Sequence, residues 1–489
     1  MATKSPPTSD RERKPGIVAT LQESAAVAFL RIFIGVFWLF ELTVGHNWKI
    51  GGFGSDVHQG WIGADRGGVV REDVAGAVAD GTWAWFGTFY EAVVVPNAVL
   101  FSWLTILIQA AFAIGFILGA FVRPLALMAL VMDFGIFMLG NSRIPPFFTA
   151  AHLALLATGA GNYYGLDGWL TTKLHDAKSG ASRAVVWLIH LPVVNRARGA
   201  LLAAAAGMAS LYFLMSIISR PTGRMQMVAL DLALLFGLVV LGLVLANRIQ
   251  DRFAIVAALL RIFVGLKFLH EIWVRTDPGV NALPGWASVD AQREFWIDIV
   301  AANHWAPFAW IAENVVAANM TAFAILFGTV QFVIGIALIV GYRTRLAGLL
   351  GLVYLGGLMS MGVTRYAPFV FGLLVVVVAL SGGRVLSLDA VLRTPSEKAL
   401  GLPVPKAAIN PLIVLAAINA IAAGWVAFRT GIEPGAYVES MTAMVPAFVA
   451  IFSGLLAFVG WIQTRPELAT NEIIDVDEKD PLPELNPIP

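Results

Sequence analysis

Two arginines stand in short proline-containing segments where their side chains could bind an anion. Arg143 lies in RIPPFF and Arg365 in RYAPFV. A guanidinium forms paired hydrogen bonds to oxyanions, so these residues could bind an oxyanion or donate to a carbonyl group of a ligand. A salt bridge from Arg143 to a glutamate, closing the fold, is an equally good interpretation. The polar residues that could complete the two substrate-binding sites are Glu41, Glu91 and Asn97 for Arg143, and Glu271, Glu313 and Asn319 for Arg365.

Asp133 and His152 are further candidates because they lie in apolar segments. Ionisable groups in such segments often mark functional sites. If the two segments are adjacent and antiparallel, the side chains lie at similar depth and could carry a proton to or from a bound ligand. A hydrogen bond that serves packing alone fits as well. We therefore take four residues as candidate catalytic groups, namely Asp133, His152, Glu41 and Glu271.

The segments that carry these residues are long and apolar. Hydrophobic residues make up 58% of the 489 residues and charged residues 13%, with a net charge of +1. This composition excludes an ordinary soluble domain. Segments of roughly 20 apolar residues can cross a bilayer as helices, and about twelve such segments occur. Because lipid does not tolerate unpaired backbone groups, the sequence predicts an all-α integral membrane protein.

The chain contains an internal repeat. LRIFIGVFWLFE at 30–41 and LRIFVGLKFLHE at 260–271 share seven of twelve residues. Further along, an offset of 222 residues pairs similar positions of the two halves, from Trp83 with Trp305 to Asp167 with Asp389. A pair of further apolar segments follows each four-segment block. An even number of spans per repeat gives both halves the same orientation in the membrane. We predict two parallel six-helix repeats.

Basic residues indicate the orientation of the chain. Cytoplasmic loops are enriched in Lys and Arg, and an N-terminus in the cytoplasm places about 20 of the 33 basic residues on the inner side. Both termini are then cytoplasmic. Arg31 and Arg261 lie toward that side, where a charge in a helix needs a partner. We predict two structural ion pairs between first and fourth helices, Arg31 with Asp167 and Arg261 with Asp389.

Three segments of the second half carry a resemblance to a known family. LRIFVGLKFLHE, GYRTRLAGLL and GGRVLSLDAVLR resemble the opening, middle and closing signatures of the DoxX/DoxD family of four-helix membrane proteins, and the first half shows them in weaker form. The chain is thus similar to two DoxX-like four-helix bundles in tandem, each with an added helix pair. The resemblance implies a prokaryotic-type plasma membrane location and a redox subunit like DoxD of thiosulfate:quinone oxidoreductase, with quinone as substrate.

These observations divide the chain and leave two function classes. The first is a membrane redox subunit that reacts with quinone and oxidises thiosulfate or another sulfur compound at the outer face, with a second redox subunit as partner. The second is a non-enzymatic module that anchors partner proteins or transports a small solute. The predicted parts are an N-terminal tail (1–22), a first four-helix module (23–170), a loop and helix pair (171–252), a second module (253–393), a loop and helix pair (394–464) and an acidic tail (465–489).

The sequence also limits the chemistry. It contains no cysteine, so no iron–sulfur cluster, disulfide or thiol nucleophile can reside on this chain. Its seven histidines lack the repeated placement that a bis-histidine haem would need, and no HExxH metal motif occurs. We expect no haem, iron–sulfur or metal centre, a lipid bilayer as partner and no nucleic acid. The oligomeric state stays open.

Overall fold

The structure is a computed structural model that describes most of the chain. It covers residues 21–43, 49–50, 59–142, 144–174, 179–191, 196–219, 223–276, 288–301, 306–360, 367–393, 404–430 and 441–464. All regular secondary structure in these ranges is helical, as the sequence predicts.

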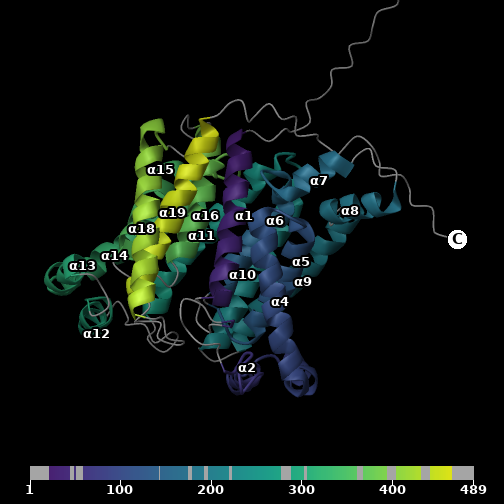
Figure 1. The fold of residues 1–489 in the computed structure, drawn as a ribbon, viewed down its shortest axis with the longest axis horizontal. Coiled ribbons are helices and arrows are strands. Elements are labelled where there is room, and N and C mark those ends of the chain that lie inside the picture. The colour runs from purple at the N-terminus through teal and green to yellow at the C-terminus, as the bar shows by residue number, and fades with distance from the viewer. Residues whose placement is uncertain are drawn as a thin grey trace, which may run out of the picture.

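Most of the helices are long and run along one direction (Figure 1). Local sequence sets several of their ends. Gly119 ends α4 with a left-handed backbone conformation (φ 70°), which glycine adopts without strain. Pro145 begins α6, where its missing N–H leaves no hydrogen bond unmade. The helices are α1 (Leu21–Thr43), α2 (Gly68–Ala79), α3 (Ala84–Phe89), α4 (Ala98–Leu118), α5 (Val122–Met138), α6 (Pro145–Thr158), α7 (Leu166–Leu174), α8 (Gly180–His190), α9 (Arg196–Ser219), α10 (Arg224–Ala246), α11 (Arg252–Thr276), α12 (Val289–Glu294), α13 (Ala306–Ile311), α14 (Met320–Val340), α15 (Thr344–Ser360), α16 (Ala367–Ala379), α17 (Leu388–Leu392), α18 (Ile409–Thr430) and α19 (Met441–Gln463).

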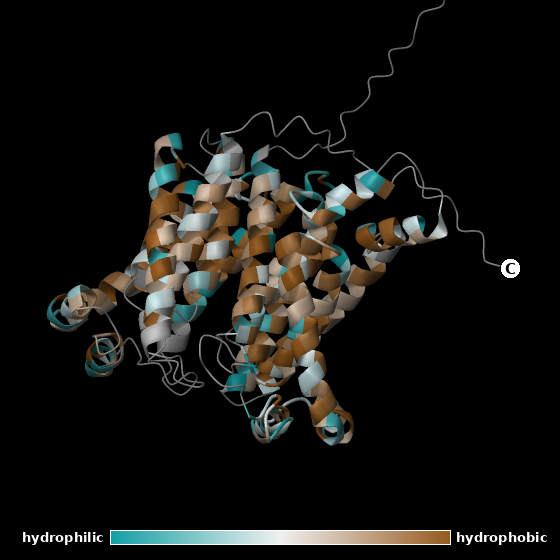
Figure 2. Ribbon diagram, in the orientation of Figure 1, coloured by the Kyte–Doolittle hydropathy of each residue, from teal (hydrophilic) through white to brown (hydrophobic). Residues whose placement is uncertain are grey.

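Seven helical stretches in the described residues are long and apolar enough to cross a membrane. They fall in α1, α3 to α4, α9, α10, α11, α14 and α18, and shorter apolar helices fall in α15, α16 and α19. Figure 2 shows hydrophobic residues along the middle of the long helices. The chain is therefore an α-helical membrane protein. The prediction of about twelve spans includes α5 and α6, which are shorter than these seven stretches.

The long helices form two four-helix groups. The first bundle consists of α1, α4, α5 and α6, and the second bundle of α11, α14, α15 and α16. The two bundles meet through their first and last helices, because α1 packs on α16, α11 packs on α6, and α6 also touches α16. Two helix pairs cover the outside of this centre. The α9/α10 pair packs against α11 and α6, and the α18/α19 pair against α1 and α15.

Aromatic side chains fill the contact between the bundles. The ring centroid of Phe369 on α16 lies 4.5 Å from that of Phe37 on α1 and 5.5 Å from that of Phe148 on α6. Phe147, also on α6, lies 5.8 Å from Phe263 on α11. Offset or edge-on ring pairs at these distances are favourable beyond the area that they bury. The centre of the molecule is therefore an apolar contact that holds the two bundles together.

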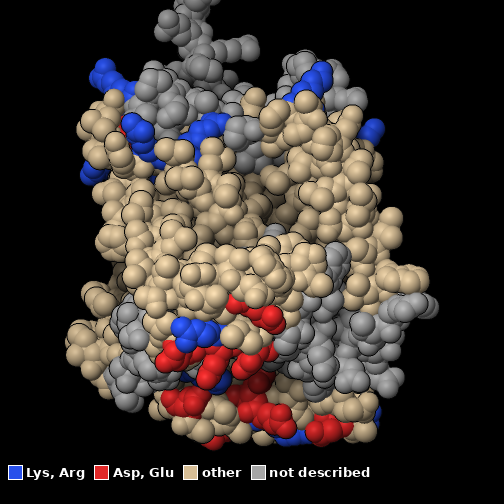
Figure 3. All heavy atoms as spheres, turned by 90° about the vertical axis from the view of Figure 1, so that its left-hand side faces the viewer, with Lys and Arg blue, Asp and Glu red and all other residues tan. Residues whose placement is uncertain are grey.

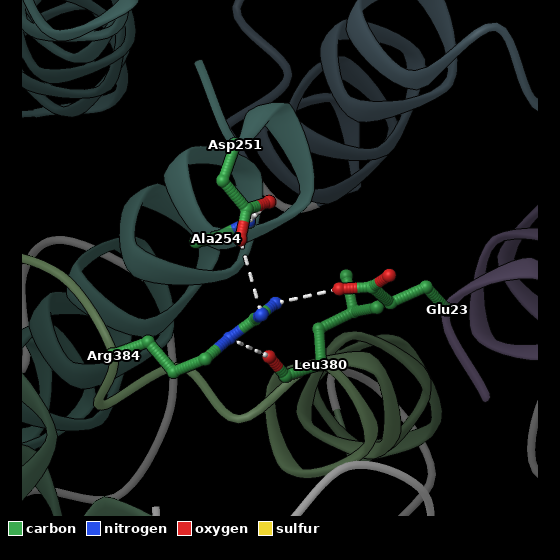
Figure 4. Close-up of polar contacts among 5 residues, drawn as sticks. All are labelled: Glu23, Asp251, Ala254, Leu380 and Arg384. Carbon is green, nitrogen blue, oxygen red and sulfur yellow. Dashed lines mark hydrogen bonds and ion pairs between the residues drawn. The ribbon is translucent and has the colours of Figure 1, made fainter. Parts of the chain in front are cut away.

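One ion-pair network joins the two bundles at the upper end in Figure 1. Arg384, which follows α16, donates to Glu23 of α1 (2.9 Å) and to Asp251 (3.1 Å), the residue before α11 (Figure 4). Its Nε also donates to the Leu380 carbonyl oxygen. Asp251 accepts from the Ala254 N–H and so caps α11. One guanidinium thus connects the starts of both first helices to the end of α16.

Charged residues gather at the two ends of the molecule. On the face in Figure 3, Lys and Arg lie mainly at the upper end, and Asp and Glu lie mainly at the lower end, with uncharged surface between them. Figure 1 places α7 and α8 at the upper right, α2 at the lower end and α12 and α13 at the left edge. An uncharged belt between two charged ends is the surface expected of a protein that crosses a bilayer.

Candidate functional site

Arg31 lies at a junction of three chain segments in the first bundle. Its guanidinium donates to the carbonyl oxygens of Phe116 (3.0 Å) and Ile117 (3.3 Å) in the last turn of α4, and to those of Tyr163 (3.4 Å) and Tyr164 (2.9 Å). The last carbonyls of a helix have no partner within it. Arg31, which is fully buried, supplies those partners and fixes α1 against the end of α4.

Asp167 completes the same junction from the start of α7. Its carboxylate accepts from the backbone N–H groups of Phe121 (2.6 Å) and Val122 (2.9 Å), where α5 begins. Its own N–H donates to the Gly119 carbonyl oxygen. We call the set of Arg31, Gly119 and Asp167 the first Arg–Gly–Asp cap. It satisfies the end of one helix and the beginning of the next with two side chains of opposite charge.

The second bundle has the same arrangement. Arg261 donates to the carbonyl oxygens of Leu338 (2.7 Å) and Ile339 (3.3 Å) at the end of α14, and to that of Leu386. Asp389 accepts from the N–H groups at the start of α15, those of Arg343 and Thr344, each at 2.8 Å. Together with Gly341, whose carbonyl accepts from the Asp389 N–H, Arg261 and Asp389 form the second Arg–Gly–Asp cap.

The contacts of Arg31 and Asp167 differ from the direct ion pair that the sequence predicted. Each side chain forms its hydrogen bonds with backbone groups, because the last carbonyls of α4 and the first N–H groups of α5 have no partner within their own helices. Burial raises the pKa of Asp167 to about 6, while the two N–H donors and the nearby Arg31 and Arg123 act to lower it. The charges attract across the cap without touching.

Asp133 and His152 lie together, as their placement on neighbouring segments suggested. Asp133 is on α5 and His152 on α6, and Oδ2 of the first lies 2.7 Å from Nδ1 of the second. The Thr149 hydroxyl also donates to Oδ2 (3.1 Å). Asp133 is 1% exposed and His152 is 0% exposed. Two ionisable side chains so placed form a hydrogen-bonded pair that is closed to water in this conformation.

Trp38 of α1 determines which imidazole nitrogen carries the proton. Its indole N–H donates to His152 Nε2 (3.1 Å), so this nitrogen accepts and is unprotonated. The neutral imidazole therefore has its proton on Nδ1, from which it donates to Asp133 Oδ2. The other carboxylate oxygen, Asp133 Oδ1, is buried and accepts no hydrogen bond. This atom can take a proton without breaking any bond in the Trp38–His152–Asp133 chain.

The Asp133–His152 pair is surrounded by aromatic rings. The imidazole is stacked with Trp38 and with Phe148, each with centroids 5.9 Å apart. Phe116 lies 5.5 Å away in a tilted orientation. In so apolar a surrounding, a change in the net charge of the site is costly. The pair is therefore suited to gaining a proton when a neighbouring group gains negative charge at the same time.

A second buried pair lies on the other side of α6. Lys267 of α11 donates to Asp231 of α10, and both are 5% exposed or less. The Lys267 ammonium also lies 5.6 Å from the ring centroid of Phe147 and 5.8 Å from that of Phe263. The sequence interpretation did not place this pair in the site. The signal was two charged residues in apolar segments, but only the packing of α10 on α11 shows that they meet.

The outer candidates are not brought together as one site. Glu91 and Glu313 lie in the π-helical segments Tyr90–Val94 and Ala312–Ala317, and they are exposed. Asn97 and Asn319 are also exposed, and each amide donates to a carbonyl four residues earlier. Glu41, by contrast, is partly buried. Arg143 and Arg365 lie outside the described residues, and Glu271 is partly buried on α11.

Glu41 instead accompanies a lysine that the sequence interpretation missed. The buried Lys49 ammonium donates to the Glu41 carbonyl oxygen (3.0 Å) and lies 3.9 Å from its carboxylate. It also lies 5.1 Å from the ring centroid of Trp61, within the range of a cation–π contact. Burial lowers the pKa of Lys49, whereas Glu41 and Asp73 raise it. No sequence pattern predicts this contact, because it depends on where the folded chain places Lys49 relative to the end of α1.

Within the ranges that the structure describes, three or more His, Asp or Glu side chains do not gather in a way that could hold a metal ion. Comparison of the chain with models of protein families, with curated proteins and with solved structures gives no match. The fold and the site define an α-helical membrane protein with two buried ionisable pairs, one on each side of α6. The DoxX/DoxD resemblance stays a prediction.

Proposed function

We propose that the chain is a quinone-reactive redox protein of the plasma membrane, in which the Asp133–His152 pair exchanges protons with the quinone. The observation that carries this proposal is the buried chain from Trp38 through His152 to Asp133, with the unpaired Oδ1 at its end. Buried ionisable groups in membrane helices are typical of proton relays. The resemblance to DoxD supplies the expectation that the oxidant is a quinone.

The chemistry balances as a two-electron transfer. Two thiosulfate ions each lose one electron and join through a new sulfur–sulfur bond to give tetrathionate, and the quinone gains two electrons and two protons to give the quinol. Another reduced sulfur compound could replace thiosulfate as the donor. A chain without cysteine offers no thiol for sulfur transfer, so we place oxidation of the sulfur compound on or with a second subunit at the outer face.

The proton steps use the atoms described above. When the quinone gains electrons, it takes a proton from Asp133 that has been protonated on Oδ1, and Asp133 returns to the carboxylate. Asp133 Oδ1 then accepts the next proton from the inner side, so two such transfers complete the quinol. His152 keeps its Nδ1 proton and stabilises the carboxylate by donating to Oδ2. Coupling proton uptake to quinone reduction avoids a net charge in the aromatic surroundings.

The same proposal includes the finer architecture. The two Arg–Gly–Asp caps and the matching helix contacts of the two bundles support two parallel six-helix repeats with about twelve spans in all. The basic upper end and the acidic lower end in Figure 3 support a cytoplasmic location of both termini. The Arg–Gly–Asp caps occur in both bundles and serve the architecture, whereas the Asp133–His152 pair occurs in one and serves the chemistry.

The experiment is thiosulfate-dependent reduction of a short-chain benzoquinone by purified protein in detergent, alone and with co-purifying subunits. Asp133→Asn and His152→Gln should each lower turnover by about 100-fold, the effect of losing a proton-transfer group. Thr149→Val, which removes only one hydrogen bond to Asp133, should have a small effect and serves as the matched control. Unchanged turnover in both main variants, with intact size-exclusion profiles, would refute the proton role.

A solute transporter is the second candidate, and the Lys267–Asp231 pair favours it. Buried ion pairs within spans also mark ion and substrate pathways. The aromatic contact between the bundles leaves no polar surface along which a solute could cross there. A solute pathway would therefore follow α10 and α11. Proton-driven uptake into vesicles that is lost in the double variant Lys267→Met with Asp231→Leu, together with no quinone reduction by the unaltered protein, would support this function instead.

A further inference from the structure

The two short helices α7 and α8 form a surface at the end of the first bundle. They pack on each other, and α8 packs on α5. The Arg123 guanidinium of α5 donates to the His190 carbonyl oxygen at the end of α8, and the Thr171 hydroxyl of α7 lies 3.2 Å from the imidazole Nε2 of the same histidine. Ile189 is buried beneath them. The hairpin is therefore docked in one position and presents a defined outer side.

That outer side combines tryptophan with basic residues. Trp169 is 58% exposed and Lys173, four residues later, is exposed. On α8 the order is reversed, with an exposed Arg183 four residues before Trp187, which is 43% exposed. Residues four apart lie on the same side of a helix. Each helix thus presents one indole and one cation together, and exposed leucines extend the apolar part, namely Leu166 and Leu188.

The exposed charges in the described parts of α7 and α8 have a single sign. The one acidic residue in the described parts of α7 and α8 is Asp167, and it is buried in the first Arg–Gly–Asp cap. The exposed charges, Lys173 and Arg183, are both positive. Figure 1 places the hairpin at the upper right of the molecule, and α8 runs across the direction of α1. A helix in this orientation at the end of a bundle can lie in the plane of a membrane surface.

We propose that the α7–α8 hairpin is an interfacial binding surface for the headgroups of anionic phospholipids. Indole rings favour the boundary between headgroups and acyl chains, and amphipathic helices with cations on their polar side bind anionic lipids there. Trp169, Trp187 and Leu188 enter this boundary, while Lys173 and Arg183 bind the lipid phosphates. This surface is separate from the Asp133–His152 pair, and its role does not depend on the proposed redox function.

The experiment uses the absence of cysteine, which allows a bimane fluorophore to be attached at one position through Leu188→Cys. The labelled full-length protein is reconstituted in phosphatidylcholine vesicles that contain a nitroxide-labelled phosphatidylglycerol or a nitroxide-labelled phosphatidylcholine. We expect both nitroxides to quench the bimane, with a preference for phosphatidylglycerol. Each basic residue near an anionic surface contributes about fivefold to binding, so Lys173→Gln with Arg183→Gln should lower that preference by about twentyfold.

Three outcomes would overturn the proposal. A bimane that neither nitroxide lipid quenches would place the surface in water or under another protein. Equal quenching by the two lipids in the otherwise unaltered protein would remove the preference for an anionic headgroup. If inorganic phosphate changes the bimane emission in phosphatidylcholine vesicles and does so only when Lys173 and Arg183 are present, the cations bind a free anion instead. Arg71→Gln, on α2 at the opposite end, is the matched control and should leave the preference unchanged.

Discussion

Replacement of Arg31 by methionine tests the first Arg–Gly–Asp cap most directly. The variant keeps a side chain of similar length but leaves four carbonyl oxygens without their donor, those of Phe116, Ile117, Tyr163 and Tyr164. An unsatisfied buried acceptor costs about 1 to 3 kcal/mol. Because neighbouring carbonyls share the loss and relax together, we expect a total of about 4 kcal/mol, within the range for breaking a buried charged network.

The assay is heating in detergent followed by fluorescence-detected size-exclusion chromatography. A loss of about 4 kcal/mol should lower the apparent melting temperature by about 4 °C in a chain of this size. Arg31→Lys should recover part of the loss, because an ammonium donates fewer bonds in a less fixed geometry. Arg71→Met is the control, since its ion pair with Asp65 is exposed and worth little.

Arg261→Met provides the matched test in the second bundle. The same donor geometry predicts a loss of similar size, since Arg261 donates to the end of α14 as Arg31 does to the end of α4. A melting temperature of the Arg31→Met variant equal to that of the unaltered protein would refute the assignment of a structural role. A large loss in one variant and none in the other would show that the two caps are not equivalent.

Three further predictions concern other buried groups. Gly119→Ala should destabilise the protein, because φ is 70° and a Cβ would lie 2.0 Å from the Arg31 guanidinium, whereas Gly328→Ala, with open space around the Cβ, should not; similar melting temperatures would disprove the close contact. Lys267→Met alone should cost about 3 to 5 kcal/mol by leaving a charge unpaired, and adding Asp231→Leu should restore most of the thermal stability; a double variant as unstable as the single one would contradict this. Burial raises the pKa of Asp167 to about 6 from 3.8, so its contribution to stability is fully present below pH 3.8 and falls by about 3 kcal/mol as the pH rises through 6. Asp167→Asn should flatten this dependence in melting curves between about pH 4 and 6, and an unchanged slope would count against it.

The sequence predicted the class of the fold because apolar composition and segment length indicate helices that are surrounded by lipid. The prediction of an α-helical membrane protein is confirmed in that form. The identical positions in the two opening helices drew attention to Arg31 and Arg261, and the structure shows that both are fully buried. Spacing alone did not show their partners, because every residue has a backbone carbonyl and the residue type therefore does not identify the acceptor.

Candidate sites were predictable to different degrees. Asp133 and His152 could be matched because neighbouring antiparallel helices joined by a short loop must lie side by side. Glu91 and Asn97 precede α4, as the sequence indicated, but the rotation of the helix about its axis leaves both side chains exposed. Glu91 itself lies in the π-helical segment Tyr90–Val94. Rotation of a helix about its axis depends on the packing of its neighbours, which a repeat pattern does not encode.

The sequence by itself determined that this chain is apolar, helical, repeated and free of cysteine, because each of these properties is local or can be counted. Only the tertiary structure decided which charges meet. Lys267 pairs with Asp231 of a different helix because α10 packs on α11. Trp38 sets the proton position on His152 because α1 packs against α6. Contacts between distant segments follow from how helix surfaces fit, and that fit is a property of the whole packed chain.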